Sequence, residues 1–417
     1  MRKKFFFIHF IALLLFSCQN ISNYKKEDDD SLEYYPPTPL NLSKQEFRHY
    51  HRLLQNFMDT SLLKSGFNGG IIIAKNGNPI YEKYAGFVDI RKKDTINENT
   101  SFHIASTSKT FTAIAILQLV QNGRLSLQDS VQKYFPRFPY KGITVKMLLN
   151  HRSGLPNYLY FMSNYKWGMD EKGKWNHQYA TNNEVLEVMI KKIPNPTGSP
   201  DTKFNYSNTN FVLLALIIEK ITGKPFPEYM KQQIFDPLHM DHTYVFQLKD
   251  SLTATPSFTA KGTYWNFDFL DATFGDKNVY TTPRDLLKWD QALNSDFLLS
   301  AALLDSAFAP YSFEKPSIHN YGLGWRLQLL TNGKKVVYHF GKWHGSNAAF
   351  ARLIDENATI IIIGNRFNRM IYDAAHLCYD FFGDYQQRKT TADIEEDSLS
   401  KSQELKPELK KRKKSAN

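Results

Sequence analysis

The chain has 417 residues, of which 42% are hydrophobic and 22% charged, which is the mixture of an ordinary globular protein and excludes wholesale disorder. Its 31 Phe, 23 Tyr and 6 Trp residues are enough to fill a large core and to line an aromatic cleft. No run of about 18 apolar residues exists, so a bundle of membrane-spanning helices is also excluded.

The formal net charge of +11 is concentrated at the two ends of the sequence. Arg2, Lys3 and Lys4 contribute three positive charges, and residues 406–417 contribute a net five. The remaining charge of +3 is ordinary for a folded body. We therefore do not expect nucleic acid to be the main partner.

The first eighteen residues have the layout of an export signal. A basic start precedes an apolar run from Phe5 to Phe16, which is too short to span a bilayer. The run ends in Leu15-Phe16-Ser17-Cys18, which resembles a bacterial lipoprotein cleavage box with Cys18 as the lipid attachment site, although Phe16 is bulkier than the usual residue there. We expect residues 1–18 to be a lipoprotein signal peptide, with the protein exported, membrane-anchored, and facing the periplasm or the cell surface. A plain signal peptide with an unmodified Cys18 is the alternative.

The rest of the chain divides by composition into a tether, a folded body and a tail. Residues 19–45 are polar and typical of a tether, and residues 46–386 carry the patterns of a folded domain. Aromatic residues vanish and charge dominates over residues 387–417, which predicts a disordered charged tail. Cys378 is the only other cysteine and lies in an apolar helical pattern, so no internal disulfide is expected.

Strand patterns stand at both ends of the body, with helical patterns between them. β-Branched runs around Asn76-Gly77-Asn78 predict a hairpin over residues 67–90. Helical spacing follows over residues 106–122 and 210–221, and Thr282-Pro283 opens a third helix. Later strands are predicted at 321–330, 336–340, 348–354 and 359–365. The pattern predicts an α+β fold of the α/β sandwich type, with one antiparallel sheet built from N- and C-terminal strands, helices flanking it, and a mostly helical lobe inserted.

One Ser-x-x-Lys pair stands out among several. Seven serines have a Lys three positions later, but only Ser106 follows a strand-like entry and begins a long apolar helix. One helical turn places the Ser106 hydroxyl and the Lys109 amine on the same face. A desolvated lysine can take the proton of such a hydroxyl, and the positive end of the helix favours the developing negative charge.

Two further short motifs are candidates for the same site. Tyr206-Ser207-Asn208 follows a turn-rich stretch and leads directly into an apolar helix, which suits catalysis better than a second triplet, Tyr264-Trp265-Asn266. His339-Phe340-Gly341 ends a β-branched strand, where a glycine lets substrate backbone approach closely.

Taken in order, Ser106-Thr107-Ser108-Lys109, Tyr206-Ser207-Asn208 and His339-Phe340-Gly341 resemble the three motifs of the serine β-lactamase and penicillin-binding-protein superfamily, in its class C-like branch. The segments FHIASTSKTFTAIAILQLVQNGRLSLQDSV, MLLNHRSGLPNY, FNYSNTNFVLLALIIEKITGKPF and YGLGWRL also look like that branch. The resemblance covers about residues 48 to 383, and it is specific for the family rather than for a substrate.

The resemblance implies a role for each motif residue. Ser106 would be the acylated nucleophile, Lys109 its proton partner, and Tyr206 a general base or the acid that protonates the leaving group. Asn208, His339, Gly341 and Lys342 would bind substrate, with the backbone N–H groups of Ser106 and Lys342 as the oxyanion hole.

The motif Lys-Thr-Gly of many relatives is His339-Phe340-Gly341 here, so a permanent cation is missing. With an unperturbed pKa of about 6.5, His339 would be mostly neutral at pH 7. We therefore expect a preference for neutral substrates at that pH, and rising activity on anionic substrates below about pH 6.

The sequence predicts a serine hydrolase that acts through an acyl-enzyme on an ester or amide, small-molecule or peptide, without metal or organic cofactor. A β-lactamase or D,D-carboxypeptidase acting on cell-wall peptides is one alternative, and a non-catalytic penicillin-binding-like scaffold is another. His239-Met240-Asp241-His242 matches half of a zinc ligand pattern, but no upstream His pair completes it.

Overall fold

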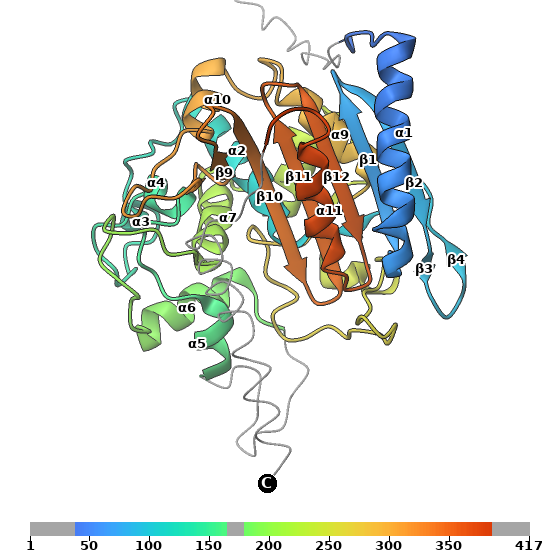
Figure 1. Cartoon of the computed structure of the whole chain (residues 1–417). Helices are drawn as coiled ribbons and strands as arrows, with labels where there is room; N and C mark the ends of the chain where they lie inside the picture. The colour runs from blue at the N-terminus through green and yellow to red at the C-terminus, as the bar shows by residue number, and fades with distance from the viewer. Residues whose placement is uncertain (1–37, 165–178, 386–417) are drawn as a thin grey trace, which may run out of the picture. The chain divides into compact units, whose positions relative to one another are not determined.

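The computed structural model describes residues 38–164 and 179–385, and these are organised around a seven-stranded antiparallel sheet (Figure 1). The strand order is β2-β1-β12-β11-β10-β9-β8. Their bounds are β1 (Gly69–Lys75), β2 (Asn78–Ala85), β8 (His319–Tyr321), β9 (Arg326–Leu329), β10 (Lys335–Trp343), β11 (Ser346–Leu353) and β12 (Ala358–Gly364). The N-terminal hairpin lies beside the last strand, so the predicted α+β architecture is confirmed.

The centre of the sheet is held together by isoleucines on neighbouring strands. Ile71 stands opposite Ile362 and Ile73 opposite Ile360, and all four side chains are completely buried. β-Branched side chains fit a pleated surface, which explains why these two segments pair although they lie almost at opposite ends of the folded body.

The N-terminal hairpin turns where its sequence predicts, but the loop is Asn76-Gly77 and does not include Asn78. Asn76 and Gly77 both have positive φ, 53° and 76°, which is the requirement of a two-residue hairpin turn. Asn78 already begins β2.

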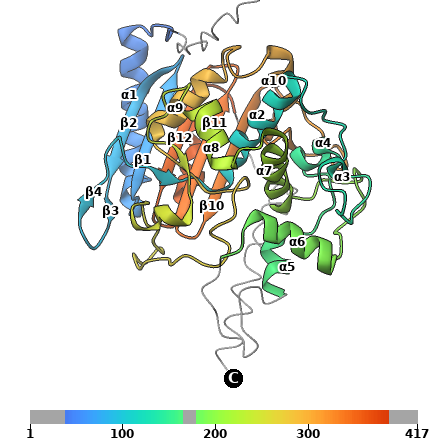
Figure 2. The ribbon, with the colours of Figure 1, turned by 180° about the vertical axis from the view of Figure 1, so that it is seen from behind.

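Helices cover both faces of the sheet. Helices α1 (Lys44–Thr60) and α11 (Met370–Tyr379) lie on one face, and α2 (Ser108–Gln121) and α9 (Pro283–Ala292) lie on the other (Figures 1 and 2). On the first face, Leu54 and Ile371 join the strand isoleucines in one core cluster. On the second, Phe111 of α2 stacks on Trp289 of α9 with ring centroids 4.2 Å apart.

The middle of the chain is mostly helical, as predicted. It contains α3 (Val131–Tyr134), α4 (Val145–Leu149), α5 (Tyr158–Asn164), α6 (Asn182–Lys192), α7 (Thr209–Thr222), α8 (Phe226–Met230) and α10 (Ala301–Ala307). Short strands form two small sheets, β3 (Phe87–Asp89) with β4 (Asp94–Thr95), and β5 (Phe102–His103) with β7 (Val279–Thr281) and β6 (Tyr244–Val245). Over residues 38–164 and 179–385, no helix has both the length and the apolar character that crossing a bilayer requires.

The three predicted helices form close to their expected bounds. A 3₁₀ turn over Ala105–Thr107 precedes α2, so the regular helix begins two residues after Ser106. At α9 the Thr282 hydroxyl accepts a hydrogen bond from the Asp285 N–H at 3.0 Å, which is the cap that the sequence indicates.

The prediction of one continuous strand over residues 321–330 is wrong, because the structure has two short strands there. Residues 322–325 separate β8 from β9. Gly324 has φ of +86°, and a Cβ there would stand 2.3 Å from the Ala113 Cβ of α2. The strand is therefore interrupted where α2 packs against it, and alternation in the sequence alone does not reveal that contact.

The expected signal peptide with Cys18, most of the tether, and the charged tail lie outside the described residues, so the lipid anchor and the domain limits stay predictions. Cys378 is completely buried on α11.

Candidate active site

Lys109 is the centre of the site and is completely buried. Its Nζ donates hydrogen bonds to Ser106 Oγ at 3.1 Å, to Asn208 Oδ1 at 2.8 Å and to the Asp276 carbonyl oxygen at 2.7 Å. An ammonium group has three donors, so these partners use all of them. The short turn from β5 into α2, with Ala105 at φ of +48°, holds Ser106 over this amine.

The Tyr-Ser-Asn motif meets the Ser-x-x-Lys motif in space. Asn208 precedes α7, and because its Oδ1 accepts from Lys109, its amide NH₂ remains available to donate to a substrate. The Tyr206 ring centroid lies 5.1 Å from Lys109 Nζ. The structure thus brings Ser106, Lys109, Tyr206 and Asn208 together.

His151 packs against the Tyr206 ring and holds the backbone of Ser207, and sequence reasoning did not single it out. Its ring lies 4.2 Å from that of Tyr206, and its Nδ1 accepts from the Ser207 N–H at 3.3 Å. Burial lowers the pKa of His151 well below its usual value, helped by the charges of Lys109 and nearby groups, so the ring is neutral.

Gly341 brings strand β10 against the turn that carries Ser106. A Cβ at this position would stand 2.2 Å from the Ile104 carbonyl oxygen and 2.9 Å from the Ser106 nitrogen. A side chain at position 341 would collide with this backbone, so only a glycine lets β10 lie this close to the turn that carries Ser106. The Lys342 N–H follows immediately in the strand.

His339 is completely buried and both of its ring nitrogens have partners. Nδ1 lies 2.9 Å from the Phe340 carbonyl oxygen, which can only accept, so Nδ1 carries the hydrogen and Nε2 accepts from the Tyr321 hydroxyl at 3.1 Å. Burial, with the charges of Arg326 and Lys109, lowers the pKa of His339 well below its usual value. The buried ring therefore resists protonation more than a free imidazole does; rising activity on anionic substrates below about pH 6 and a direct contact between His339 and substrate both stay predictions.

Arg326 is a second cation at this site that sequence reasoning missed. It begins β9, is partly exposed, and its guanidinium carbon lies 5.2 Å from the Tyr206 ring centroid. The YGLGWRL segment that contains it was recognisable, but nothing in that segment shows which way the side chain points.

Lys277 lies beside this centre and is also buried, at 2% exposure. Its Nζ donates to the Tyr158 hydroxyl at 2.8 Å, to the Leu270 carbonyl oxygen at 2.9 Å and to Thr273, and it lies 3.9 Å from a carboxylate oxygen of Asp276. Because Asp276 also supplies the carbonyl that binds Lys109, one residue contacts both buried lysines.

Other candidate groups are bonded to partners other than Ser106 and Lys109 or are exposed. The Ser153 hydroxyl is buried and donates to Asn210 Oδ1 at 2.7 Å, and Tyr264 of the second Tyr-x-Asn triplet donates to Asp89 at 2.5 Å. His239, Asp241 and His242 of the partial zinc pattern are exposed.

Among the residues that the structure describes, one group has ligand atoms close enough for a metal ion, namely Asp268, Asp271 and His344, within 4.8 Å of one another. The Asp271 carboxylate already accepts hydrogen bonds from Trp343 Nε1 at 2.6 Å and lies 3.0 Å from His344 Nε2. We assign no metal to it.

Comparisons with known proteins place these motifs in a family. The Beta-lactamase family model matches residues 51–377. Penicillin-binding protein 4* of Bacillus subtilis is 32% identical over 343 residues, which cover 78% of this chain and 74% of that protein. The putative penicillin-binding protein PbpX of the same organism is 29% identical over 74% of this chain and 76% of its own length.

Solved structures show the same fold at lower identity. The octameric penicillin-binding protein homologue from Pyrococcus abyssi matches with a TM-score of 0.70 and 24% identity, covering 84% of this chain and 81% of that one. D-amino acid amidase from Ochrobactrum anthropi SV3 matches with a TM-score of 0.63 and 23% identity, covering 80% of this chain and 99% of that one.

Proposed function

Because the chain belongs to the beta-lactamase family, as a serine hydrolase of the superfamily that includes the penicillin-binding proteins, we propose that it cleaves an ester or amide bond through an acyl-enzyme on Ser106. The observation that carries the proposal is the hydrogen bond from the fully buried Lys109 Nζ to Ser106 Oγ. A lysine held in that position, once it has lost its proton, can accept the proton of the hydroxyl.

The reaction has two balanced steps. Ser106 Oγ attacks the substrate carbonyl and forms an acyl ester, while its proton passes through Lys109 and Tyr206 to the leaving alcohol or amine. A water molecule then attacks the ester, releases the acid and restores the Ser106 hydroxyl. The N–H groups of Ser106 and Lys342 would bind the negative oxygen of each intermediate, and the Gly341 approach supports that pairing.

A second candidate function is the hydrolysis of carboxylate-bearing cell-wall peptides or β-lactams. The observation in its favour is Arg326, whose guanidinium lies beside the Tyr206 ring and offers a permanent cation where His339 offers none. A guanidinium binds a carboxylate in a bidentate manner. The expected preference for neutral substrates rested on the missing lysine alone and does not take Arg326 into account.

The test of the nucleophile uses labelling of the purified domain with a fluorophosphonate and a fluorescent penicillin. Ser106→Ala should abolish all labelling, and Ser153→Ala, which removes a buried hydroxyl bound to Asn210, should leave it intact. Labelling by the fluorophosphonate alone favours esterase-like chemistry. Labelled peptide that maps to another serine, or no labelling by either probe, would refute the proposal and leave a non-catalytic scaffold.

We also propose that the protein is an exported lipoprotein, on the evidence of residues 1–18 alone. Cys18→Ala should move the protein from the membrane fraction to the soluble fraction without changing the activity of the domain. Several acyl chains anchor a protein firmly where one gives marginal binding. Incorporation of a fatty-acid analogue that persists in the Cys18→Ala variant would contradict this.

A further inference from the structure

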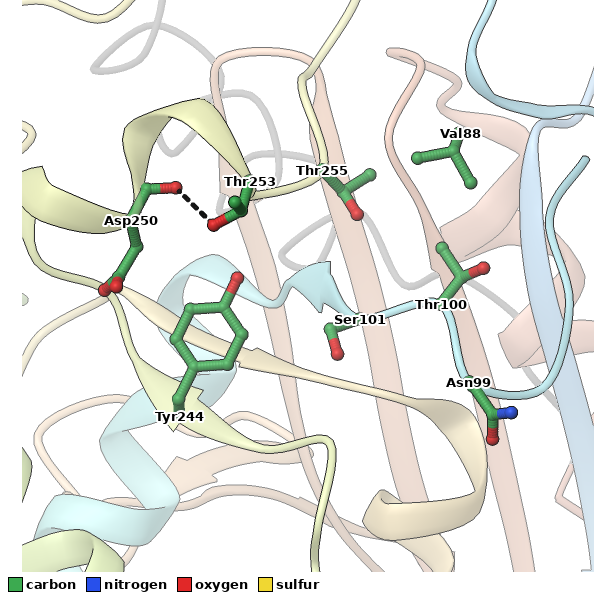
Figure 3. Close-up of a pocket in the computed structure, with 8 residues that line it drawn as sticks. All are labelled: Val88, Asn99, Thr100, Ser101, Tyr244, Asp250, Thr253 and Thr255. Atoms are coloured by element: carbon green, nitrogen blue, oxygen red, sulfur yellow. Dashed lines mark hydrogen bonds between the residues drawn. The ribbon is translucent and has the colours of Figure 1, made fainter. Parts of the chain in front are cut away.

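Two neighbouring cavities share Thr255, and the rest of their linings differs. The first has a volume of about 420 Å³ and is lined mainly by hydroxyl and amide groups, with Asp250 and Tyr244 at one end (Figure 3). The second has a volume of about 330 Å³, shares Thr255 with the first, and is lined largely by aromatic rings. Of the two, only the second cavity is lined by a residue of strand β10, which is Trp343.

The second cavity shares a wall with the catalytic centre. Trp343 lines it, and because side chains alternate along a strand, Trp343 lies on the same face of β10 as His339 and Gly341. At about 3.3 Å per residue, Trp343 lies about 7 Å along the strand from Gly341. His103, three residues before Ser106, also lines the cavity, and its Nε2 is hydrogen-bonded to Asn278 Oδ1. The distance from Gly341 to this wall is thus of the length of a short acyl chain.

The lining is aromatic and carries a buried negative charge. Seven Phe, Tyr and Trp rings contribute to it, those of Tyr179, Phe246, Tyr264, Trp265, Phe267, Tyr280 and Trp343. Asp271 is 2% exposed; burial acts to raise its pKa, but hydrogen bonds from His344 and Trp343 outweigh that effect and hold the pKa below its usual value. Burial lowers the pKa of His103 to about 4, so that ring is uncharged.

Asp271 is the acidic residue among the described residues that line the cavity, and His344 lies 3.0 Å from its carboxylate. No Lys or Arg is among the described residues that line it. Two cations lie against rings of the lining: the Arg91 guanidinium carbon is 3.9 Å from the Tyr264 ring centroid, and Lys277 Nζ, which is paired with Asp276, is 4.9 Å from that of Trp343. Asp268 lies next to Asp271 and His344 but does not line the cavity, and burial together with the charge of Asp271 raises its pKa. Aromatic faces together with an ionised carboxylate are the environment that binds organic cations in proteins.

We propose that this cavity is a substrate subsite for a positively charged organic group, an ammonium carried on the acyl side of the scissile bond. The proposal rests on the proposed function, because it names the class of substrate that the Ser106 centre would take. With Arg326 at the Tyr206 side of the centre and Asp271 beyond Trp343, the two sides of the site carry opposite charges.

The test compares two esters of the same shape, the p-nitrophenyl esters of 6-(trimethylammonio)hexanoic acid and of its uncharged isostere 7,7-dimethyloctanoic acid. Both are assayed with the full chain at pH 8 with EDTA present, so that the Asp268, Asp271 and His344 group cannot act through a divalent ion. The cationic ester should have a kcat/KM on the order of tenfold higher than the neutral one. An equal or lower value for the cationic ester would overturn the proposal.

Three variants identify the source of the preference. Asp271→Asn removes the charge and should bring the ratio of the two kcat/KM values towards one. Trp265→Leu, which keeps an apolar side chain on a partly exposed loop, should lower the ratio several-fold and serves if Asp271→Asn fails to fold. Asp250→Asn is the matched control, because it removes a carboxylate that lines the first cavity only (Figure 3), and should leave the ratio unchanged.

The outcomes separate this proposal from the proposed function. If both esters are hydrolysed equally and Ser106→Ala abolishes both activities, the subsite is refuted and the serine hydrolase stands. If Asp250→Asn lowers the ratio as much as Asp271→Asn, the preference arises from the general field of the protein, and the subsite is again refuted. If neither ester is hydrolysed and no serine is labelled, the proposed function itself fails.

Discussion

Lys109 and Lys277 are two buried lysines in one part of the fold, and they differ in what they contact. Both are almost inaccessible to solvent, and both contact Asp276, one through its carbonyl and the other through its carboxylate. All partners of Lys277 are buried or main-chain groups. Lys109 instead gives one of its three hydrogen bonds to Ser106 Oγ, a partly exposed hydroxyl.

The comparison shows that burial of a charge does not by itself mark a catalytic residue. Burial lowers the pKa of Lys277, and its pairing with Asp276 works against that shift. We therefore interpret Lys277 as a structural cation that fixes residues 270–277, and Lys109 as the cation whose proton can move to or from a reacting group.

The largest expected effect is on catalysis, from Lys109→Met. This change should lower kcat/KM about 10⁴-fold, because the serine loses its proton partner. The free energy of unfolding should fall only by about 1–3 kcal/mol, since the three oxygens that lose the Lys109 donor are neutral. Activity within tenfold of the native protein would remove the distinction between the two lysines. Lys220→Met, on the exposed face of α7, is the control and should change neither quantity.

The reverse effect is expected from Lys277→Met. Removing one partner of a buried ion pair leaves Asp276 unpaired and should cost about 3–5 kcal/mol of stability, measured by urea unfolding. The folded protein should still be labelled at Ser106 by a fluorophosphonate. A loss of labelling in fully folded protein would mean that Lys277 acts in the chemistry.

Buried histidines extend the comparison to groups that must stay uncharged. His103, His151 and His339 all have a pKa below the usual value, with burial as the largest cause. In the unfolded chain these rings bind protons below about pH 6.5, and in the folded protein they do not. Stability is therefore complete above that pH and is lost as the pH falls, by up to about 1.4 kcal/mol per pH unit for each ring.

The measurement is the free energy of unfolding at pH 7, 6 and 5. His103→Gln should reduce the change in the free energy of unfolding between pH 6 and 5 by up to about 1.4 kcal/mol, the contribution of one buried ring. His49→Gln, at an exposed position of α1, should not change it. A flat profile between pH 7 and 5 would contradict neutral, buried histidines.

The smallest effect concerns the third cation of this region, Arg326. Arg326→Gln should raise KM about tenfold for an anionic acyl substrate, with little change for a neutral one.

His339→Lys is the contrasting variant. It places a charge where the imidazole is completely buried against Tyr321, so it should lower activity on both substrates. A selective gain on anionic substrates in His339→Lys would restore the original role predicted for His339.

Local patterns determined much of the fold. Period-two and helical spacings located the Ile71–Ile73 strand, helices α2 and α7, and the Thr282 cap, because each depends on residues a few positions apart. The contact between Ser106 and Lys109 was predictable for the same reason, since one helical turn joins them.

Only the tertiary structure decided what surrounds that pair. The Asp276 carbonyl, the Arg326 guanidinium and the burial of His339 against Tyr321 all depend on how separate segments pack, and no periodic pattern records such contacts. The aromatic cavity beside Trp343 is likewise assembled from β5, the loops that carry Trp265 and Asp271, and the end of β10. The sequence by itself therefore determined the elements and the Ser106–Lys109 pair, and the packing of distant segments determined the charged groups that surround this pair.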